Sequence, residues 1–233
     1  MNEAVNMKRP FVYNLYESPV APEEIERRSF EAIDREADSS RFSPEEWIVV
    51  RRMIHTTADF GLLDAVKFSP DAIGAAVEAF GRGAPLYVDS NMIRSGLSVA
   101  RLAAVWQGYT REMIRCHVAD GDVAEECAAA GLPRSIFAAR KARPWLDGAV
   151  VAIGNAPVAL LEINRMVMEE GIRPAVVIGM PVGFIHVLES KEELMRLGVP
   201  YITVTGRRGG SPMAVSVVHS LLAIAEARRG AAV

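Results

Sequence analysis

Three glycine-rich segments are the places where this chain could hold a charged ligand. They are residues 154–157, 179–183 and 206–211, and each directly follows a short apolar run. Glycine lets the backbone approach a ligand closely, and free N–H groups at the start of a helix attract anions. We therefore expect carboxylates or phosphates to bind there, although any one of these segments could simply be a tight turn.

None of the three segments has the spacing of a nucleotide-binding loop. Residues 206–211 lack the GxxxxGK[ST] pattern, and no GxGxxG sequence opens a predicted helix, so a nucleotide is not required. The GxSxG pattern is also absent, and Ser211 precedes Pro212 without forming a nucleophile elbow. A serine hydrolase of that kind is therefore disfavoured.

His55 is the histidine best placed to exchange a proton. It falls in the last turn of a predicted helix, where the helix dipole stabilises imidazolium and favours a proton donor near neutral pH. A structural role is the alternative for a single histidine in an amphipathic helix. His117, His186 and His219 form no HxxH or HExxH pattern, so the sequence predicts no metal ligands.

Three arginines could bind carboxylates through paired N–H donors. Arg134 lies between Pro133 and an apolar stretch, and Arg207 and Arg208 lie inside the third glycine-rich segment. Exposed arginines are usually solvated, and we favour that interpretation for Arg208. From these residue types alone, the chain is predicted to be an α/β domain with a cleft suited to anions.

The elements predicted to position these residues are helices in the first third of the chain and short strands between helices in the rest. A helix is predicted from residue 21 to about 38, and a capping box at 43–46 starts the helix that carries His55. Another helix begins near residue 69 and ends at 81–83. Five short aliphatic or β-branched runs follow, at residues 85–88, 113–118, 149–153, 175–178 and 201–205.

The last three runs are almost continuously apolar, as strands covered on both faces must be. Because helical segments follow them, we predict a three-layer α/β/α sandwich around a mostly parallel five-stranded sheet. The prediction is one domain over residues 1–233, with about residues 1–20 as an N-terminal extension. Ligands of such sheets bind beyond the carboxyl ends of the strands, where the glycine-rich segments lie.

The composition excludes several classes of partner. The 233 residues are half hydrophobic and carry a formal net charge of −3, which provides no overall basic field for nucleic acid. The sequence contains no run of about 18 apolar residues, the length needed to span a membrane. The N-terminal residues lack the apolar core of a signal peptide. Cys116 and Cys127 form no disulfide framework or CxxC pair. We expect a cytoplasmic protein.

The order of several motifs resembles the precorrin-8X methylmutase family of corrin biosynthesis, from about Glu23 to Leu222. The motifs are IERRSF at 25–30, RMIHTTADF at 52–60, DSNM at 89–92, AD and DVA within 119–124, PRS at 133–135, AIGNAP at 152–157, VIGMPVGF at 177–184, ESKE at 189–192 and GRRGGS at 206–211. The HTTADF and DSNM wording is more similar to the type that handles cobalt.

This resemblance implies a homodimer that holds a corrin precursor, precorrin-8X or cobalt-precorrin-8, near the subunit interface. It implies an isomerase in which a methyl group moves from C-11 to C-12 of ring C by a suprafacial 1,5-shift, giving hydrogenobyrinate or cobyrinate. No external methyl donor and no dissociable cofactor are implied, and any cobalt arrives inside the substrate. The family's catalytic histidine matches His55, which would supply a proton near ring C.

The same matching implies which residues contact the substrate. They are Ser29, Thr57, Asp89, Asn91, Met92, Arg134, Gly154, Asn155, Pro181, Gly183, Arg207, Gly209, Gly210 and Ser211. One position departs from the family, because His219 stands where the family usually has asparagine, and we expect local repacking there. Two alternatives remain open, a non-catalytic tetrapyrrole carrier and an unrelated α/β enzyme that uses a nucleotide.

Overall fold

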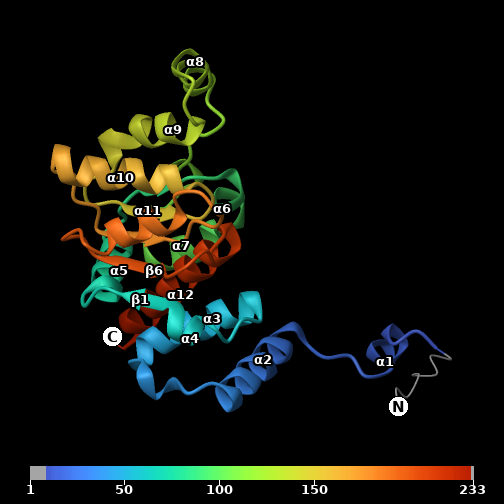
Figure 1. Cartoon of the computed structure of the whole chain (residues 1–233). Helices are drawn as coiled ribbons and strands as arrows, with labels where there is room; N and C mark the ends of the chain where they lie inside the picture. Colours follow the sequence, from blue (N-terminus) through green and yellow to red (C-terminus); the bar gives the residue numbers. More distant parts are fainter. Residues whose placement is uncertain (1–8, 232–233) are drawn as a thin grey trace.

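The computed structural model describes residues 9–231 and contains a six-stranded sheet between two layers of helices (Figure 1). The strands are β1 Val66–Phe68, β2 Leu86–Val88, β3 Ile114–Arg115, β4 Val150–Ile153, β5 Val176–Gly179 and β6 Tyr201–Val204. Their order in the sheet is β1-β6-β5-β4-β2-β3. β2 to β6 pair in parallel, and β1 pairs with β6 in the antiparallel direction.

The sheet confirms the mostly parallel prediction but corrects the number of strands from five to six. β1 was missed because it has three residues, follows the short helix α4 (Leu62–Ala65) and exposes Lys67 at the sheet edge. Within residues 9–231 it pairs with β6 alone. It is therefore a strand because it pairs with a distant segment, and its local sequence pattern does not indicate one. The expected strand at 113–118 shrinks to two residues, since a 3₁₀ turn, Arg111–Met113, occupies its start.

Alternating side chains of the central strands divide the core into two parts. Val150 and Ala152 join the cluster formed with helices α3 (Pro44–Thr57), α5 (Ala72–Gly81) and α12 (Ser211–Gly230). Val151 and Ile153 join the cluster formed with α9 (Arg134–Ala142) and α10 (Pro157–Glu170). All four are fully buried. A strand covered by helices on both faces requires apolar side chains at every position, so the continuous apolar runs correctly predicted three layers.

Helices cover the sheet in two groups. On one side lie α2 Pro22–Glu36, α3 Pro44–Thr57, α5 Ala72–Gly81, α6 Asn91–Gly96, α7 Val99–Val105 and α12 Ser211–Gly230; on the other lie α8 Gly121–Ala130, α9 Arg134–Ala142, α10 Pro157–Glu170 and α11 Val187–Leu194. The capping box that starts α3 is present, with Ser43 and Glu46 each bonding the other's backbone N–H. Two more 3₁₀ turns follow helices: Ser39–Arg41 lies between α2 and α3, and Arg143–Trp145 lies between α9 and β4.

The N-terminal helix α1, Val12–Glu17, lies apart from the body of the molecule in Figure 1. None of its residues is buried, and Phe11, Leu15 and Tyr16 are largely exposed. α2 packs against α3 and connects this arm to the sheet layers.

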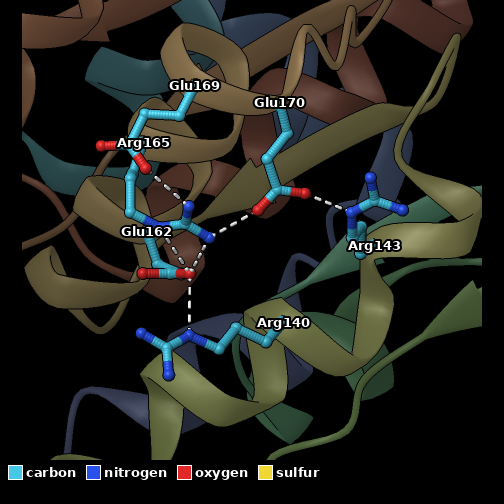
Figure 2. A network of polar contacts seen from close by, with 6 residues as sticks. All are labelled: Arg140, Arg143, Glu162, Arg165, Glu169 and Glu170. Carbon is cyan, nitrogen blue, oxygen red and sulfur yellow. Dashed lines mark hydrogen bonds and ion pairs between the residues drawn. The ribbon is translucent and has the colours of Figure 1, made fainter.

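A network of ion pairs joins α9 to α10, in the helix layer opposite α3 and α12 (Figure 2). The buried carboxylate of Glu162 accepts hydrogen bonds from Arg140 Nε at 2.9 Å and Arg165 Nη2 at 2.7 Å. Arg165 also pairs with Glu169 and Glu170, and Glu170 pairs in turn with Arg143. Burial would raise the pKa of Glu162, but the arginine hydrogen bonds outweigh it and lower the pKa.

Candidate active site

The three glycine-rich segments converge at the carboxyl ends of β4, β5 and β6, which are neighbours in the sheet. The Gly210 N–H donates to the Met180 carbonyl at 2.8 Å. A Cβ on Gly209 would lie 2.3 Å from that same oxygen, and one on Gly154 would lie 2.8 Å from Ser211 Cα. Only glycine allows these segments to pack so closely, so their convergence depends on the missing side chains.

Asp89, directly after β2, organises the first of these segments. Its buried carboxylate accepts the N–H groups of Gly154 at 2.9 Å, Asn155 at 2.9 Å and Ala156 at 2.7 Å. Burial raises the pKa of Asp89, and the three hydrogen bonds oppose that effect. The anion bound by the N–H groups at 154–156 is therefore this internal carboxylate. Asp89 positions the segment, and its predicted direct contact with substrate stays a prediction.

Lys191 on α11 performs the corresponding task for the third segment. Its side chain is 1% exposed, and its Nζ donates to the carbonyls of Gly206 at 3.0 Å and Arg208 at 2.6 Å. Burial lowers the pKa of Lys191 to about 8. Sequence reasoning missed this residue, although it lies inside the ESKE motif, because a lysine in a polar helix is normally solvated.

Arg208 ties the third segment to the end of α3. Its Nε lies 2.7 Å from Asp59 Oδ2, and the other oxygen of Asp59 accepts the Gly61 N–H at 2.8 Å. Arg208 is exposed, as the favoured interpretation expects, and it also forms this surface ion pair. Arg207 is exposed, and its guanidinium lies 5.5 Å from the ring centre of Phe184.

His55 lies in the last turn of α3, as predicted, with its side chain exposed. Its ring packs edge-on against Phe30 of α2, with 5.3 Å between ring centres. Ser29, next to Phe30, donates its hydroxyl to the Ile25 carbonyl at 2.8 Å. Thr57 donates to the Met53 carbonyl at 2.9 Å, which stabilises the last turn of α3. The structure thus places Ser29, His55 and Thr57 around the contact between α2 and α3.

A cavity of about 350 Å³ opens between α3, α6 and α12. Thr56, which follows His55 in the chain, lines it together with Met92, Pro212 and His219, among others. The Ser90 and Ser211 hydroxyls, 2.9 Å apart, join the starts of α6 and α12. The cavity therefore lies between the last turn of α3 and the first turns of α6 and α12.

His219, the position that departs from the family, bonds to the start of a neighbouring helix, and the expected local repacking stays a prediction. Its Nε2 accepts the Ser98 N–H at 3.3 Å at the start of α7. Burial lowers the pKa of His219 to about 4, and the nearby charges of Arg101 and Arg52 act in the same direction. The ring is therefore neutral at physiological pH and serves as a hydrogen-bond acceptor.

Arg134 lies at the opposite end of the candidate site. It is the first residue of α9, and its Nη1 approaches the Val118 carbonyl beyond β3 at 3.4 Å. Four strand spacings of about 4.8 Å separate β6 from β3. The predicted contacts are consequently spread along roughly 19 Å of sheet edge and do not form one compact pocket.

Residues 9–231 contain neither a candidate membrane-spanning helix nor a candidate metal-binding cluster. No helix there is both long enough and apolar enough to cross a membrane. Within the same residues, no three His, Cys, Asp or Glu side chains gather in an arrangement that could hold a metal ion.

Known proteins are similar to this chain over most of their length. A family model described as precorrin-8X methylmutase matches residues 24–224. The cobalt-precorrin-8 methylmutase of Leptospira interrogans serogroup Icterohaemorrhagiae serovar Lai is 42% identical over 212 residues, covering 88% of this chain and 94% of the relative. The precorrin-8X methylmutase of a Sinorhizobium species is 40% identical, covering 84% of this chain and 92% of the relative.

A solved structure gives the same result for the fold. The crystal structure of precorrin-8X methylmutase from Thermus thermophilus superposes with a TM-score of 0.80 at 41% identity, covering 88% of this chain and 97% of that one. The family match over residues 24–224 includes all six strands and the three converging segments. The chain belongs to the precorrin-8X methylmutase family.

Proposed function

We propose that this chain is an isomerase of cobalamin biosynthesis that moves a methyl group from C-11 to C-12 of a corrin precursor. The observation that carries the proposal is the family match over residues 24–224, whose motifs converge on one edge of the sheet. A site about 19 Å wide suits a macrocycle fringed with carboxylates better than a compact metabolite.

His55 is the residue that we propose as proton donor. Substrate and product are isomers, so a proton added near ring C during the shift must leave again before product is released. A positioned general acid accelerates such a step by about 10²–10⁴. Fixing the macrocycle in one pose supplies the remaining requirement, because the migrating methyl group and its acceptor carbon belong to the same molecule.

The converging segments and arginines supply the means of holding the substrate. Arg207 and Arg134 are exposed near the two ends of the site and can each bind a carboxylate with paired N–H donors. The exposed Asn155 and Asn91 lie between them, after β4 and at the start of α6. We expect these groups to determine the pose and His55 to act on it.

We propose cobalt-precorrin-8 as the natural substrate, with product cobyrinate. Support comes from the HTTADF and DSNM motifs and from relatives named cobalt-precorrin-8 methylmutase in Leptospira interrogans and Priestia megaterium. The cobalt belongs to the substrate, and we propose that the shift uses no dissociable cofactor and no external methyl donor.

We further propose a homodimer that acts in the cytoplasm. The largely exposed apolar side chains of Phe11, Leu15 and Tyr16, together with Ile25 on α2, supply surface that a second copy would cover. The unpaired Cys116 and Cys127 suit a reducing compartment.

The direct test is to mix the purified protein with precorrin-8X and, separately, with cobalt-precorrin-8 and record visible spectra. Moving the methyl group alters the conjugated system, so we expect catalytic conversion of at least one pigment, with the cobalt form faster. Tight binding of both pigments without conversion would instead identify a carrier. Thermal stabilisation by ATP, NAD or S-adenosylmethionine would favour an unrelated nucleotide-using enzyme.

A further inference from the structure

A second cavity, at the edge of the sheet, contains a group of polar atoms that lack partners. It measures about 270 Å³ and is lined by Arg94, Arg115 and His117, among others. Arg94 Nε, Arg115 Nε and His117 Nε2 are each buried, and none has a hydrogen-bond partner within residues 9–231. Buried polar atoms nearly always have partners, so the two arginine Nε–H groups at one cavity indicate an absent acceptor.

The two guanidinium groups also lack counter-ions. Neither Arg94 nor Arg115 forms an ion pair with any of the described residues, whereas most other arginines of the chain do. Glu112 and Asp120 also line the cavity. Asp120 is already paired with Lys141 at 2.6 Å and with His117 Nδ1 at 2.9 Å. Glu112 forms no ion pair with either arginine within residues 9–231, so neither guanidinium has a carboxylate at bonding distance there.

Aromatic stacking holds Arg115 and its neighbour His117 in place. The Arg115 guanidinium lies 4.0 Å from the ring centre of Trp145, and the His117 ring stacks on the same indole with 5.7 Å between centres. The bond between His117 Nδ1 and Asp120 fixes the imidazole. A donor that is already oriented, such as the Arg115 guanidinium, loses little entropy when a ligand binds.

The cavity lies where a substrate on the sheet edge would reach it. Arg115 ends β3, whose carboxyl end is on the same side of the parallel sheet as the glycine-rich segments. Arg94 also lines a neighbouring cavity of about 440 Å³ together with Asn91 and Arg111. Asn91 follows Ser90, which contacts Ser211. A line of polar residues therefore connects the third glycine-rich segment to Arg115.

We propose that Arg94 and Arg115, with His117 beside them, form a site for one carboxylate at the end of a short side chain of the macrocycle. A volume of 270 Å³ holds an acetate or propionate group but not the macrocycle itself. Guanidinium N–H groups match carboxylate oxygens in charge and geometry. That this carboxylate belongs to the substrate rests on the proposed function, whereas the carboxylate site itself does not.

The first arm of the test measures pigment binding. Cobyrinate, the proposed product, is titrated into the wild type, Arg115→Met, Arg94→Met and the control Arg196→Met, whose side chain is 79% exposed and far from β3 in sequence. We expect the dissociation constant to rise about tenfold or more in each cavity variant, as for loss of a charge-assisted hydrogen bond, and to stay unchanged in the control. Turnover at saturation should change less than about threefold, because these residues do not contact ring C.

The second arm uses sodium propionate alone, compared with sodium chloride at equal ionic strength. Propionate should raise the melting temperature of the wild type by about 3 °C and have no such effect on Arg115→Met. If the wild type converts pigment but neither arm depends on Arg94 or Arg115, the inference is overturned and the proposed function stands. If propionate binds through Arg115 but no pigment binds, the carboxylate site stands and the proposed function fails. Should Arg115→Met not fold, Arg94→Met decides both arms.

Discussion

At the residue scale, His55 is exposed and its described ring contact is with Phe30, so its removal tests chemistry separately from folding. We predict that His55→Ala reduces turnover at least about a hundredfold while pigment affinity stays within about tenfold, because only the general acid is lost. Stopped absorbance assays at saturating pigment, with binding measured separately, check this. Unchanged turnover would return His55 to a structural role.

His219→Asn is a matched control for His55→Ala, since asparagine can also accept the Ser98 N–H. It carries a prediction of its own. The pKa of His219 is lowered from 6.5 to about 4, so below pH 6.5 the unfolded chain binds a proton that the folded chain does not. The free energy of unfolding therefore decreases as the pH is lowered from about 6.5 to about 4.

Allowing for partial solvent screening, this histidine should cost the wild type about 1–2 kcal/mol between pH 7 and pH 4.5. His219→Asn should show a smaller loss over the same interval and near-normal activity at pH 7. Urea unfolding of both proteins at pH 7 and at pH 4.5 measures this loss of stability. Identical pH dependence in the two proteins would mean that His219 does not titrate as described.

Sequence reasoning at this scale located His55 but not the residues that act through others. Asp89 was expected to touch the substrate, and its role in holding the N–H groups of 154–156 was not predicted. The contacts of Lys191 and the Arg208–Asp59 ion pair were not predicted either. Their partners lie 15 to 149 residues away, and local sequence carries no signal for which distant carbonyl or carboxylate a side chain will meet.

At the element scale, Lys191 shows how α11 shapes the segment after β6. We predict that Lys191→Met raises the KM for pigment about tenfold and lowers kcat much less, because the Gly206 and Arg208 carbonyls lose their shared donor. The melting temperature should change by only a few degrees, since removing a buried ammonium offsets the lost bonds. Lys67→Met, on the exposed edge of β1, is the control. An unchanged KM would contradict this positioning role.

The α9–α10 network in Figure 2 predicts a separate effect on stability alone. Glu162→Gln should lower the free energy of unfolding by about 1–3 kcal/mol at pH 7, because two arginines lose a buried charged acceptor. The lowered pKa of Glu162 means that its contribution is present above the ordinary glutamate pKa and is lost as pH falls through the lowered value. The difference from wild type should therefore shrink in acid.

Glu169→Gln is the matched control, because that side chain is 64% exposed and forms one described ion pair. We expect it to change stability by less than about 0.5 kcal/mol. Equal effects of the two substitutions in urea unfolding would contradict the assignment of Glu162 as the centre of the network.

The elements most accurately predicted are those with strong local signals. The capping box fixed the start of α3 at Pro44, and the continuous apolar runs identified β4, β5 and β6. β1 and the two-residue β3 depend on pairing at the sheet edges, where short exposed strands lack a readable pattern.

At the scale of the whole molecule, the site extends from the α2–α3 contact to the end of β3. We predict that the protein is a dimer in solution and that removing residues 1–20 weakens the dimer, because the exposed Phe11, Leu15 and Tyr16 would be lost. Light scattering across a concentration series measures this. A wild-type monomer at micromolar concentration would contradict the proposed assembly.

The measurement that tests the central claim most directly is a crystal structure with the corrin product bound. The account predicts the macrocycle across the carboxyl ends of the strands, its side-chain carboxylates on the glycine-rich segments and arginines, and the His55 imidazole within about 2.6–3.2 Å of a ring C atom or joined to it through one water. A macrocycle bound elsewhere, or one that leaves His55 far from C-11 and C-12, would contradict it.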